Sequence, residues 1–206
     1  MEKYPKIQSI FKRDQKTHKF IEGEWSLPEF EYLKNNHWIW TEKVDGTNIR
    51  IIHRDGSVEI RGRTDNAQIP SFLYKELQEM FSCENFRELY PGTSIMCLYG
   101  EGYGARIQKG GGNYISDGVN FILFDVWIDG WWLDRNNMED VAEKLGVKMV
   151  PIRGKGSLLD AIDVVKRGVK SMWGNFDAEG LVLKPQVQLF SRKGERIITK
   201  LKTKDF

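Results

Sequence analysis

The stretch Trp40-Thr41-Glu42-Lys43-Val44-Asp45-Gly46-Thr47-Asn48-Ile49-Arg50 lies between two runs that are typical of β-strands. Lysine is a poor nucleophile while it is protonated, and it becomes a good one when burial or nearby positive charge removes its proton. The Asp45-Gly46 pair predicts a tight turn, because glycine adopts backbone angles that other residues avoid. Lys43 is therefore interpreted either as a rigidly held nucleophile facing a cleft or as a solvated lysine on an ordinary hairpin.

The composition is that of a globular protein with enough apolar residues for a sizeable core. Of 206 residues, 40% are hydrophobic and 29% are charged. This length favours one large domain over two small ones. A net charge of +2 does not by itself indicate nucleic-acid binding, so any basic site has to come from local clustering.

The cysteines and the amino-terminal sequence indicate in which cellular compartment the chain is expected. Cys83 and Cys97 do not have the spacing of metal ligands, and we interpret them as buried thiols in a reducing compartment. The amino terminus does not resemble a signal peptide, and no apolar run reaches the roughly 18 residues of a membrane span. We expect an intracellular, cytoplasmic protein with no membrane partner. Three scattered histidines are not expected to bind metal: His18, His37 and His53.

The pattern of apolar residues predicts an α+β fold in which antiparallel sheets carry helices on their faces. Asp55-Gly56 is a strong hairpin signal between two of the strands. We read residues 1–24 as polar and irregular. The predicted strands are 38–42, 49–53, 58–63, 94–99, 120–128, 147–152, 179–184 and 196–202. The predicted helices are 30–33, 70–82, one capped by Asp134 or Asn136, and one capped by Ser157.

A glycine-rich segment, residues 102–112, follows one of the buried strands. It matches neither the dinucleotide-binding pattern nor the P-loop. It is either a flexible connector or a lid that contacts phosphates through Arg106 and Lys109, and the sequence leaves both interpretations open.

Two strand ends carry candidate site residues. Phe124 follows an apolar run and could stack on a base, which contributes about 1–3 kcal/mol, although a core phenylalanine is the more common case. Glu179 stands at the mouth of a very apolar strand, where a carboxylate could face a hard cation bound to phosphates. Because side chains alternate along a regular strand, Lys184 is predicted on the face opposite Glu179 and is not assigned to the site unless a bulge intervenes.

Lys200 and Lys202 lie two residues apart on one face of the last predicted strand, and Lys204 shares their parity. Adjacent ammonium groups repel each other, and an anion such as phosphate relieves that repulsion. A solvated, charged edge strand is the alternative. Two such lysines beside a buried Lys43 would favour its uncharged, nucleophilic form.

Taken together, these motifs resemble those of the covalent nucleotidyltransferases, the superfamily of ATP-dependent ligases and messenger-RNA capping enzymes. Asn48 is similar to RNA ligases, because DNA ligases and capping enzymes usually have arginine there. Glu101 with Ile107-Gln108-Lys109 resembles the phage nick-sealing RNA ligases. The resemblance covers about residues 38–204, and its motifs stand in the family's order: Lys43-Val44-Asp45-Gly46-Thr47-Asn48, Arg63-Thr64, Tyr99-Gly100-Glu101, Phe124-Asp125, Glu179-Gly180-Leu181-Val182-Leu183-Lys184 and Lys200-Leu201-Lys202.

The resemblance implies a nucleotidyltransferase fold with an ATP site between the sheets, and a three-step reaction. Lys43 attacks the α-phosphorus of ATP to form lysyl-AMP, AMP passes to an RNA 5′-phosphate, and a 3′-hydroxyl then displaces AMP. Positioning and charge neutralisation dominate such phosphoryl transfers.

The resemblance also implies a role for each site residue. Lys200 and Lys202 hold the α-phosphate, and Glu179 handles Mg²⁺ or Mn²⁺. Glu101 and Arg63 contact the ribose or its neighbourhood, and Phe124 stacks on adenine. Glu42 helps to read adenine through its backbone, and Asn48 contacts the nucleotide phosphates or the activated end.

Because Phe206 follows the last motif directly, we expect residues 1–206 to form a single adenylation domain with no appended OB-fold or C-terminal domain. A protein partner or surface basic residues would then grip the RNA ends or nicked RNA duplex, and we expect a monomer. The alternatives are a small ATP-dependent DNA ligase or a capping-type guanylyltransferase, against which Asn48 argues, and a non-catalytic nucleotide- or RNA-binding domain. The intact charged motif residues argue against the last: Lys43, Glu101, Glu179, Lys200 and Lys202.

Overall fold

The computed structural model describes residues 3–206, which form two compact units. Residues 5–44 and 151–206 make one, which we call the Lys43 unit. Residues 3–4 and 45–150 make the other, the Asn48 unit. Both combine antiparallel sheet with helices, which confirms the α+β prediction. The prediction of a single domain is not tested by this division. Within residues 3–206, no helix combines the length and apolarity that crossing a membrane requires.

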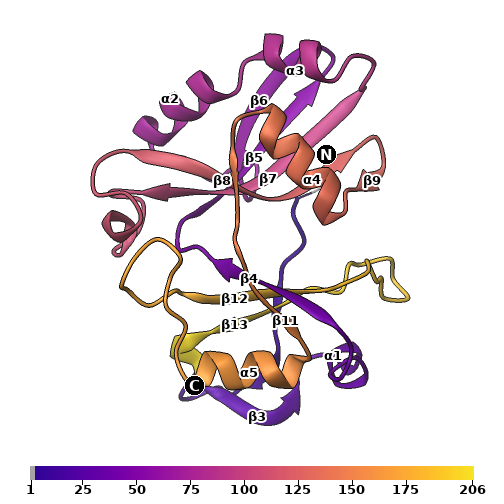
Figure 1. Ribbon diagram of the computed structural model, residues 1–206, viewed down its shortest axis with the longest axis vertical. Helices are drawn as coiled ribbons and strands as arrows, with labels where there is room; N and C mark the ends of the chain where they lie inside the picture. The colour runs from indigo at the N-terminus through magenta and orange to yellow at the C-terminus, as the bar shows by residue number, and fades with distance from the viewer. Residues whose placement is uncertain (1–2) are drawn as a thin grey trace. The chain divides into compact units, whose positions relative to one another are not determined.

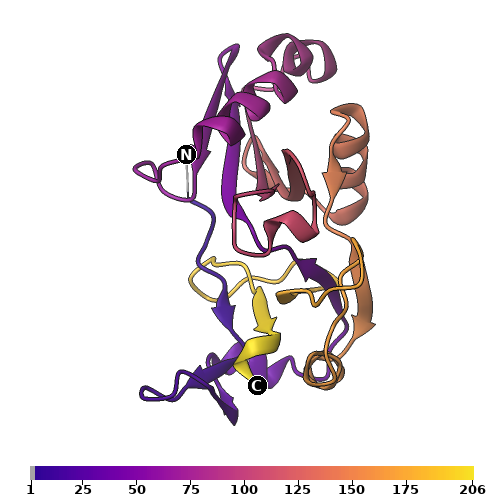
Figure 2. The same ribbon diagram turned by 90° about the vertical axis from the view of Figure 1, so that its left-hand side faces the viewer.

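The Lys43 unit is built on a five-stranded sheet (Figure 1). Its strand order is β1 (Gln8–Ser9), β13 (Thr199–Lys202), β12 (Gly180–Pro185), β4 (Trp38–Lys43) and β11 (Ile152–Gly156). Only β1 runs parallel to its neighbour, β13, and Figure 2 shows the two side by side. The unit also contains the paired strands β2 (Phe11–Arg13) and β3 (Phe20–Trp25), helices α1 (Pro28–Tyr32) and α5 (Leu158–Lys166), and the 3₁₀ turn η2 (Thr203–Asp205).

Alternation along the strands gives this sheet one apolar face. Trp38 and Trp40 of β4 pack with Leu181 and Leu183 of β12 in a buried core. Helix α5 covers this face with its buried residues Leu158, Ala161, Ile162 and Val165. It begins at the predicted cap, Ser157, whose side chain and that of Asp160 form a reciprocal capping box.

The Asn48 unit is built on a six-stranded sheet. Its strands are, in order, β10 (Lys148–Met149), β8 (Val119–Ile128), β7 (Ile95–Gly104), β5 (Thr47–Arg54) and β6 (Ser57–Gly62), with β9 (Trp131–Trp132) also pairing β8. The predicted hairpin at Asp55-Gly56 joins β5 to β6. The helical elements are α2 (Ser71–Met80), α3 (Cys83–Leu89), α4 (Arg135–Lys144) and η1 (Gly111–Asn113). Asp134 caps α4 by accepting a hydrogen bond from the backbone N–H of Asn137.

Helices α2 and α4 cover one face of this second sheet. Ile49 and Ile51 of β5 and Leu98 of β7 point into the core with Leu77 of α2 and Val141 of α4. Alternation therefore turns Asn48 and Arg50 to the other face.

The predicted elements differ from the structure in four places. Residues 1–24 are not irregular throughout, because β1, β2 and most of β3 lie there. The strand predicted over 147–152 is two strands, β10 and β11, that belong to different sheets. Helix α3 was not predicted. Strand β7 continues to Gly104, so the predicted glycine-rich loop begins inside a strand.

Candidate active site

Five lysines share one face of the sheet in the Lys43 unit: four that line its centre and the exposed Lys155 of β11, which pairs with Ile39 as Lys184 does. Gly180 is the cross-strand partner of both Lys43 and Lys202, and Val182 is the partner of Lys200. Cross-strand partners point to the same side of an antiparallel sheet, so Lys43, Lys200 and Lys202 share a face with Lys184. All four are partly buried, whereas the opposite face is the apolar core described above.

The carboxylate of Glu179 joins two of these lysines. Lys43 Nζ lies 2.5 Å from Glu179 Oε2, and Lys202 Nζ lies 2.5 Å from Glu179 Oε1. The exposed fractions are only 22% for each lysine and 15% for Glu179, so solvent screens these charges weakly. Burial raises the pKa of Glu179, but the charges of Lys43 and Lys202 and their hydrogen bonds outweigh it and hold the pKa below its usual value.

Glu179 reaches the lysine face because it precedes the regular strand. β12 begins at Gly180, whose φ of +154° differs from that of an ordinary strand residue. A Cβ at Gly180 would strike the backbone carbonyl oxygen of Leu201 on β13, so glycine permits the close pairing here. The predicted parity assumed one regular strand from Glu179 to Lys184, and this condition is not met because Glu179 lies outside β12. Lys184 lies on the same face as Lys43, and counting from Gly180 rather than from Glu179 would have placed it there.

Glu42, the residue before Lys43, anchors the end of β4 through hydrogen bonds to other parts of the chain. Its side chain is 1% exposed and points away from the lysine face. Oε1 accepts a hydrogen bond from Ser171 Oγ at 2.6 Å, and Oε2 accepts one from the backbone N–H of Met172 at 2.9 Å. The backbone N–H of Glu42 donates to the carbonyl oxygen of Pro151. Glu42 thus fixes the strand end that carries the nucleophile candidate. Adenine reading by its backbone stays a prediction.

The connection after Lys43 is not an ordinary hairpin, which was the alternative interpretation of this stretch. β4 and β5 belong to different sheets, so Lys43 ends the last strand before the chain enters the other unit. Gly46 is needed for a close approach rather than for a turn, because a Cβ there would strike the carbonyl oxygen of Gly102 and the side chain of Glu101. The side chain of Gln108 donates to the carbonyl oxygen of Gly46 at 3.0 Å. The glycine-rich segment therefore braces this connection.

The other candidate site residues lie in the Asn48 unit. Asn48 of β5 and Glu101 of β7 are cross-strand partners, so their side chains share the sheet face away from α2 and α4. Asn48 Oδ1 is buried and has no hydrogen-bond partner among residues 3–206. Such an orphaned acceptor suits a ligand that brings a donor. Arg63 follows the end of β6 and is exposed, and Arg106 of the glycine-rich segment stacks on the ring of Phe72 at 4.9 Å.

Phe124 belongs to an aromatic group on β8. Its ring centroid lies 5.1 Å from that of Tyr4, which also contacts Tyr99 and Trp132. The hydroxyl of Tyr4 donates to Asp125 Oδ2 at 2.7 Å. Phe124 is partly buried. Stacking on adenine stays a prediction.

The structure brings Lys43, Glu179, Lys200 and Lys202 together in one unit, and it places Asn48, Arg63, Glu101 and Phe124 in the other. Among residues 3–206, no three or more histidine, cysteine, aspartate or glutamate side chains gather in a way that could hold a metal ion. Glu179 is thus a single carboxylate ligand candidate. Sequence reasoning missed Lys184 and the Ser171–Glu42 bond, the second because its partners lie 129 positions apart.

The chain is similar to a known family and to solved structures. Residues 36–202 match a family model described as RNA ligase. Several solved structures of Naegleria gruberi RNA ligase are similar to this chain. A mutant with ATP and Mn is 18% identical, with a TM-score of 0.66, 97% of this chain covered and 57% of the other. The form with PPi is 22% identical, with a TM-score of 0.66, 85% of this chain covered and 52% of the other.

The chain thus spans little more than half the length of the solved structures that it matches. At these identities the structural likeness shows a shared fold, the nucleotidyltransferase fold of RNA ligases. The family match extends from just before β4 to the end of β13 and so includes every candidate site residue. This chain belongs to the RNA ligase family.

Proposed function

We propose that this chain is an ATP-dependent RNA ligase that joins RNA 3′-hydroxyl and 5′-phosphate ends through a lysyl-AMP intermediate on Lys43. The observation that carries the proposal is the lysine face, on which Glu179 joins Lys43 to Lys202 beside Lys200. Membership of the RNA ligase family supports it, as do the Naegleria gruberi structures with ATP and Mn and with PPi.

The lysine face suits the first step of the reaction. The neutral amine of Lys43 attacks the α-phosphorus of ATP, the N–P bond forms, and the bond to the departing pyrophosphate breaks. Lys200 and Lys202 lie on the same face and neutralise charge on the phosphate oxygens. Lys43 is held at a strand end whose neighbour, Glu42, is locked in place, which limits the movement of its backbone.

The second and third steps use the same centre. An oxygen of the RNA 5′-phosphate attacks the lysyl-AMP phosphorus, and Lys43 leaves as an amine. The 3′-hydroxyl then attacks the activated 5′-phosphate, and AMP departs. Asn48 and Glu101, which share one sheet face, are proposed nucleotide contacts, as are Arg63 and Phe124.

A divalent ion fits the donor set at Glu179. Mg²⁺ is commonly held by one or two carboxylates together with substrate phosphates and water, so a single carboxylate is sufficient. Glu179 would hold Mg²⁺ or Mn²⁺, which supplies charge neutralisation at the phosphate oxygens. We also propose that the chain acts as a monomer inside the cell, where its free thiols Cys83 and Cys97 stay reduced.

The first experiment incubates the purified chain with labelled ATP or GTP and Mg²⁺ and detects covalent label on the protein. Label from ATP is expected, and it should be absent in Lys43→Ala and Lys43→Arg. Lys155→Ala changes an exposed lysine of β11 in the same sheet and should label like the wild type. Label from GTP alone would indicate a capping enzyme, and no label would indicate a non-catalytic binding domain. Either result, or label that survives in Lys43→Ala, would refute the proposal.

A second experiment identifies the substrate. Nicked RNA duplex, nicked DNA duplex and single-stranded RNA ends are each offered with ATP. Sealing of RNA ends supports the proposal, whereas sealing of nicked DNA alone would assign the chain to the DNA ligases.

A further inference from the structure

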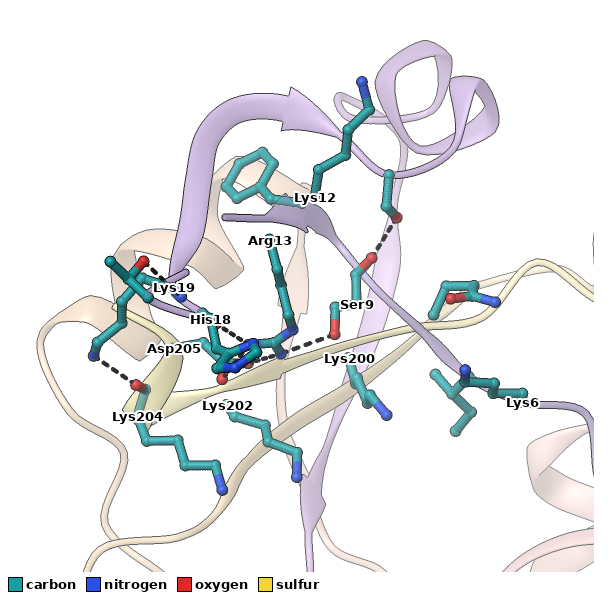
Figure 3. A pocket seen from close by; sticks show the side chains of 15 residues that line it. Lys6, Ser9, Lys12, Arg13, His18, Lys19, Lys200, Lys202, Lys204 and Asp205 are labelled. Carbon is teal, nitrogen blue, oxygen red and sulfur yellow. Dashed lines mark hydrogen bonds and ion pairs between the residues drawn. The ribbon is translucent and has the colours of Figure 1, made fainter. Parts of the chain in front are cut away.

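A basic cavity of about 740 Å³ lies in the Lys43 unit, between β13 and the segment that contains β1 and β2 (Figure 3). Seven lysine or arginine side chains line it, against one acidic side chain, Asp205. Lys200 and Lys202 belong both to this cavity and to the lysine face. The other basic residues come from outside the motifs that resemble the ligase family: Lys6, Lys12, Arg13, Lys19 and Lys204.

The negative charge of Asp205 is already neutralised. Arg13 donates two hydrogen bonds to it, from Nη1 to Oδ1 at 2.8 Å and from Nη2 to Oδ2 at 2.5 Å. Asp205 is 4% exposed, so this pair is a structural clamp between β2 and η2. Of the lysines, Lys12 is paired with Glu24 and Lys202 with Glu179, and the others leave the cavity with an excess of positive charge.

Two lysines of β13 and one of η2, which follows it, form a row rather than a cluster. Lys200, Lys202 and Lys204 project to the same side of the chain (Figure 3). Lys200 and Lys202, as alternate residues of a strand, are about 6.6 Å apart. Lys6 and Lys204 are exposed, and their ammonium groups have no hydrogen-bond or ion-pair partner among residues 3–206. A chain of phosphates satisfies a row of separated cations better than a single anion does. A flexible, exposed lysine also loses little hydration when it contacts a phosphate at the surface.

We propose that this basic cavity holds the sugar–phosphate backbone of the RNA strand whose end is being sealed. The inference rests on the proposed function. Lys202 stands between Lys200 and Lys204 and shares Glu179 with Lys43, so a strand that enters the row at Lys204 and reaches Lys202 would have its end at the nucleophile. Contacts to phosphates position a strand and carry no sequence information, which suits an enzyme that seals ends of any sequence.

The test uses the full chain and the double variant K6Q/K204Q, which removes two exposed lysines without disturbing a contact in the described chain. The matched control, K75Q/K144Q, removes two lysines from α2 and α4 in the other unit, whose side chains are 81% and 47% exposed. Three quantities are measured for each protein: covalent labelling by ATP without RNA, binding of a fluorescent nicked RNA duplex across a range of salt concentrations, and sealing at RNA concentrations below saturation.

We expect K6Q/K204Q to label with ATP at the wild-type rate, to bind RNA more weakly and to seal more slowly. The slope of the logarithm of the RNA association constant against the logarithm of the salt concentration should become shallower by about 1.4–1.8. Two phosphate contacts are lost, and each contributes about 0.7 on single strands and 0.9 on duplexes. K75Q/K144Q should keep the wild-type slope.

Two results would overturn the inference. An unchanged slope and sealing rate in K6Q/K204Q would show that RNA does not occupy the cavity. A slower reaction with ATP in this variant would show that the cavity serves the phosphates of ATP instead. Failure of the proposed function is distinguishable, because the wild-type chain would then take no label from ATP, while the RNA-binding measurement would still test the cavity.

Discussion

At the scale of single residues, Glu179 is the carboxylate that neutralises charge on both Lys43 and Lys202. Its carboxylate lies 2.5 Å from each of two lysines, in a setting where only 15% of the glutamate side chain is exposed. Removing it would leave two ammonium groups side by side. The same carboxylate is the proposed metal ligand, so its loss should affect both stability and reaction.

We predict that Glu179→Gln lowers the free energy of unfolding by about 1–3 kcal/mol near neutral pH, the typical cost of losing hydrogen bonds to a charged group. Because the pKa of Glu179 is held below its usual 4.5, its stabilising contribution is present above that pH and is lost as the pH falls through the lowered pKa. Urea unfolding should therefore separate variant from wild type at neutral pH and bring them together in acid. Glu195→Gln, an exposed change in the same unit, is the control. An equal gap at both pH values would contradict the prediction.

Glu42 offers a second prediction, because its carboxylate accepts two hydrogen bonds while almost fully buried. In Glu42→Gln the side-chain NH₂ group would face either the N–H of Met172 or the hydroxyl of Ser171. We expect a loss of about 1–3 kcal/mol in unfolding free energy and slower labelling by ATP. Ser171→Ala removes one of the two bonds to Glu42 and also the bond that Ser171 Oγ accepts from the backbone N–H of Trp173, and it should cost about 1–3 kcal/mol. Thermal and urea unfolding measure both. A fully stable Glu42→Gln variant would argue against this anchoring role.

At the scale of elements, the end of β4 and the start of β5 decide where Lys43 stands. The two strands belong to different sheets, and Gly46 between them lies against the backbone of Gly102 on β7. The connection is further held by the bond from Gln108 to the carbonyl oxygen of Gly46 and by that from the N–H of Asp45 to the hydroxyl of Tyr114. The nucleophile candidate thus ends a strand whose continuation is firmly attached.

We predict that Gly46→Ala destabilises the chain by about 1–3 kcal/mol, the usual cost of overpacking, and slows labelling by ATP. A methyl group would have to displace the backbone of Gly102, which cannot swing aside as a side chain could. Gly112→Ala is the matched control, since a Cβ at Gly112 would meet nothing within 4 Å. Chemical denaturation and the labelling assay measure the two effects, and equal behaviour of the two variants would refute this account.

Elements with a strong local signal were predictable from the sequence. The Asp55-Gly56 hairpin and the caps at Asp134 and Ser157 are each set by neighbouring residues. Strands β1 and β2 have only two and three residues, too few to show a period, and they exist because β13 and β3 pair with them.

For the candidate site, too, local features were predictable from the sequence and features that depend on strand boundaries and pairings were not. Its motif residues could be named, because their types and order are written in the chain. The parity of Lys184 could not, since it depends on where β12 begins. The change of sheet between β10 and β11 likewise depends on pairings with β8 and β4, which are remote in sequence.

For the whole molecule, His53 links stability to pH. It is 4% exposed and stacks on Phe86, and neither ring nitrogen has a hydrogen-bond partner among residues 3–206. Burial lowers the pKa of His53, and the nearby charge of Arg87 lowers it further. The unfolded chain therefore binds this proton more readily than the folded chain does.

We predict that stability falls as the pH drops from about 6.5, the usual histidine pKa, toward the lowered pKa of folded His53. His53→Phe keeps an aromatic ring against Phe86 and removes the titrating group, so its unfolding free energy should change less over this pH range. Urea unfolding between pH 7 and pH 5 measures the difference, with His37→Gln at an exposed histidine as the control. Identical slopes in His53→Phe and the wild type would exclude His53 as the cause.

Residues 204–206 are attached to the wall of the basic cavity. The ammonium group of Lys19 donates to the backbone oxygens of Lys204 and Phe206, each at 2.8 Å, and Arg13 clamps Asp205. Removal of residues 205 and 206 by a protease would take away the partner of Arg13 and one acceptor of Lys19, and would loosen this wall while leaving Lys43 and Glu179 untouched. A preparation cut in that way would pass a self-adenylation assay and still join RNA poorly.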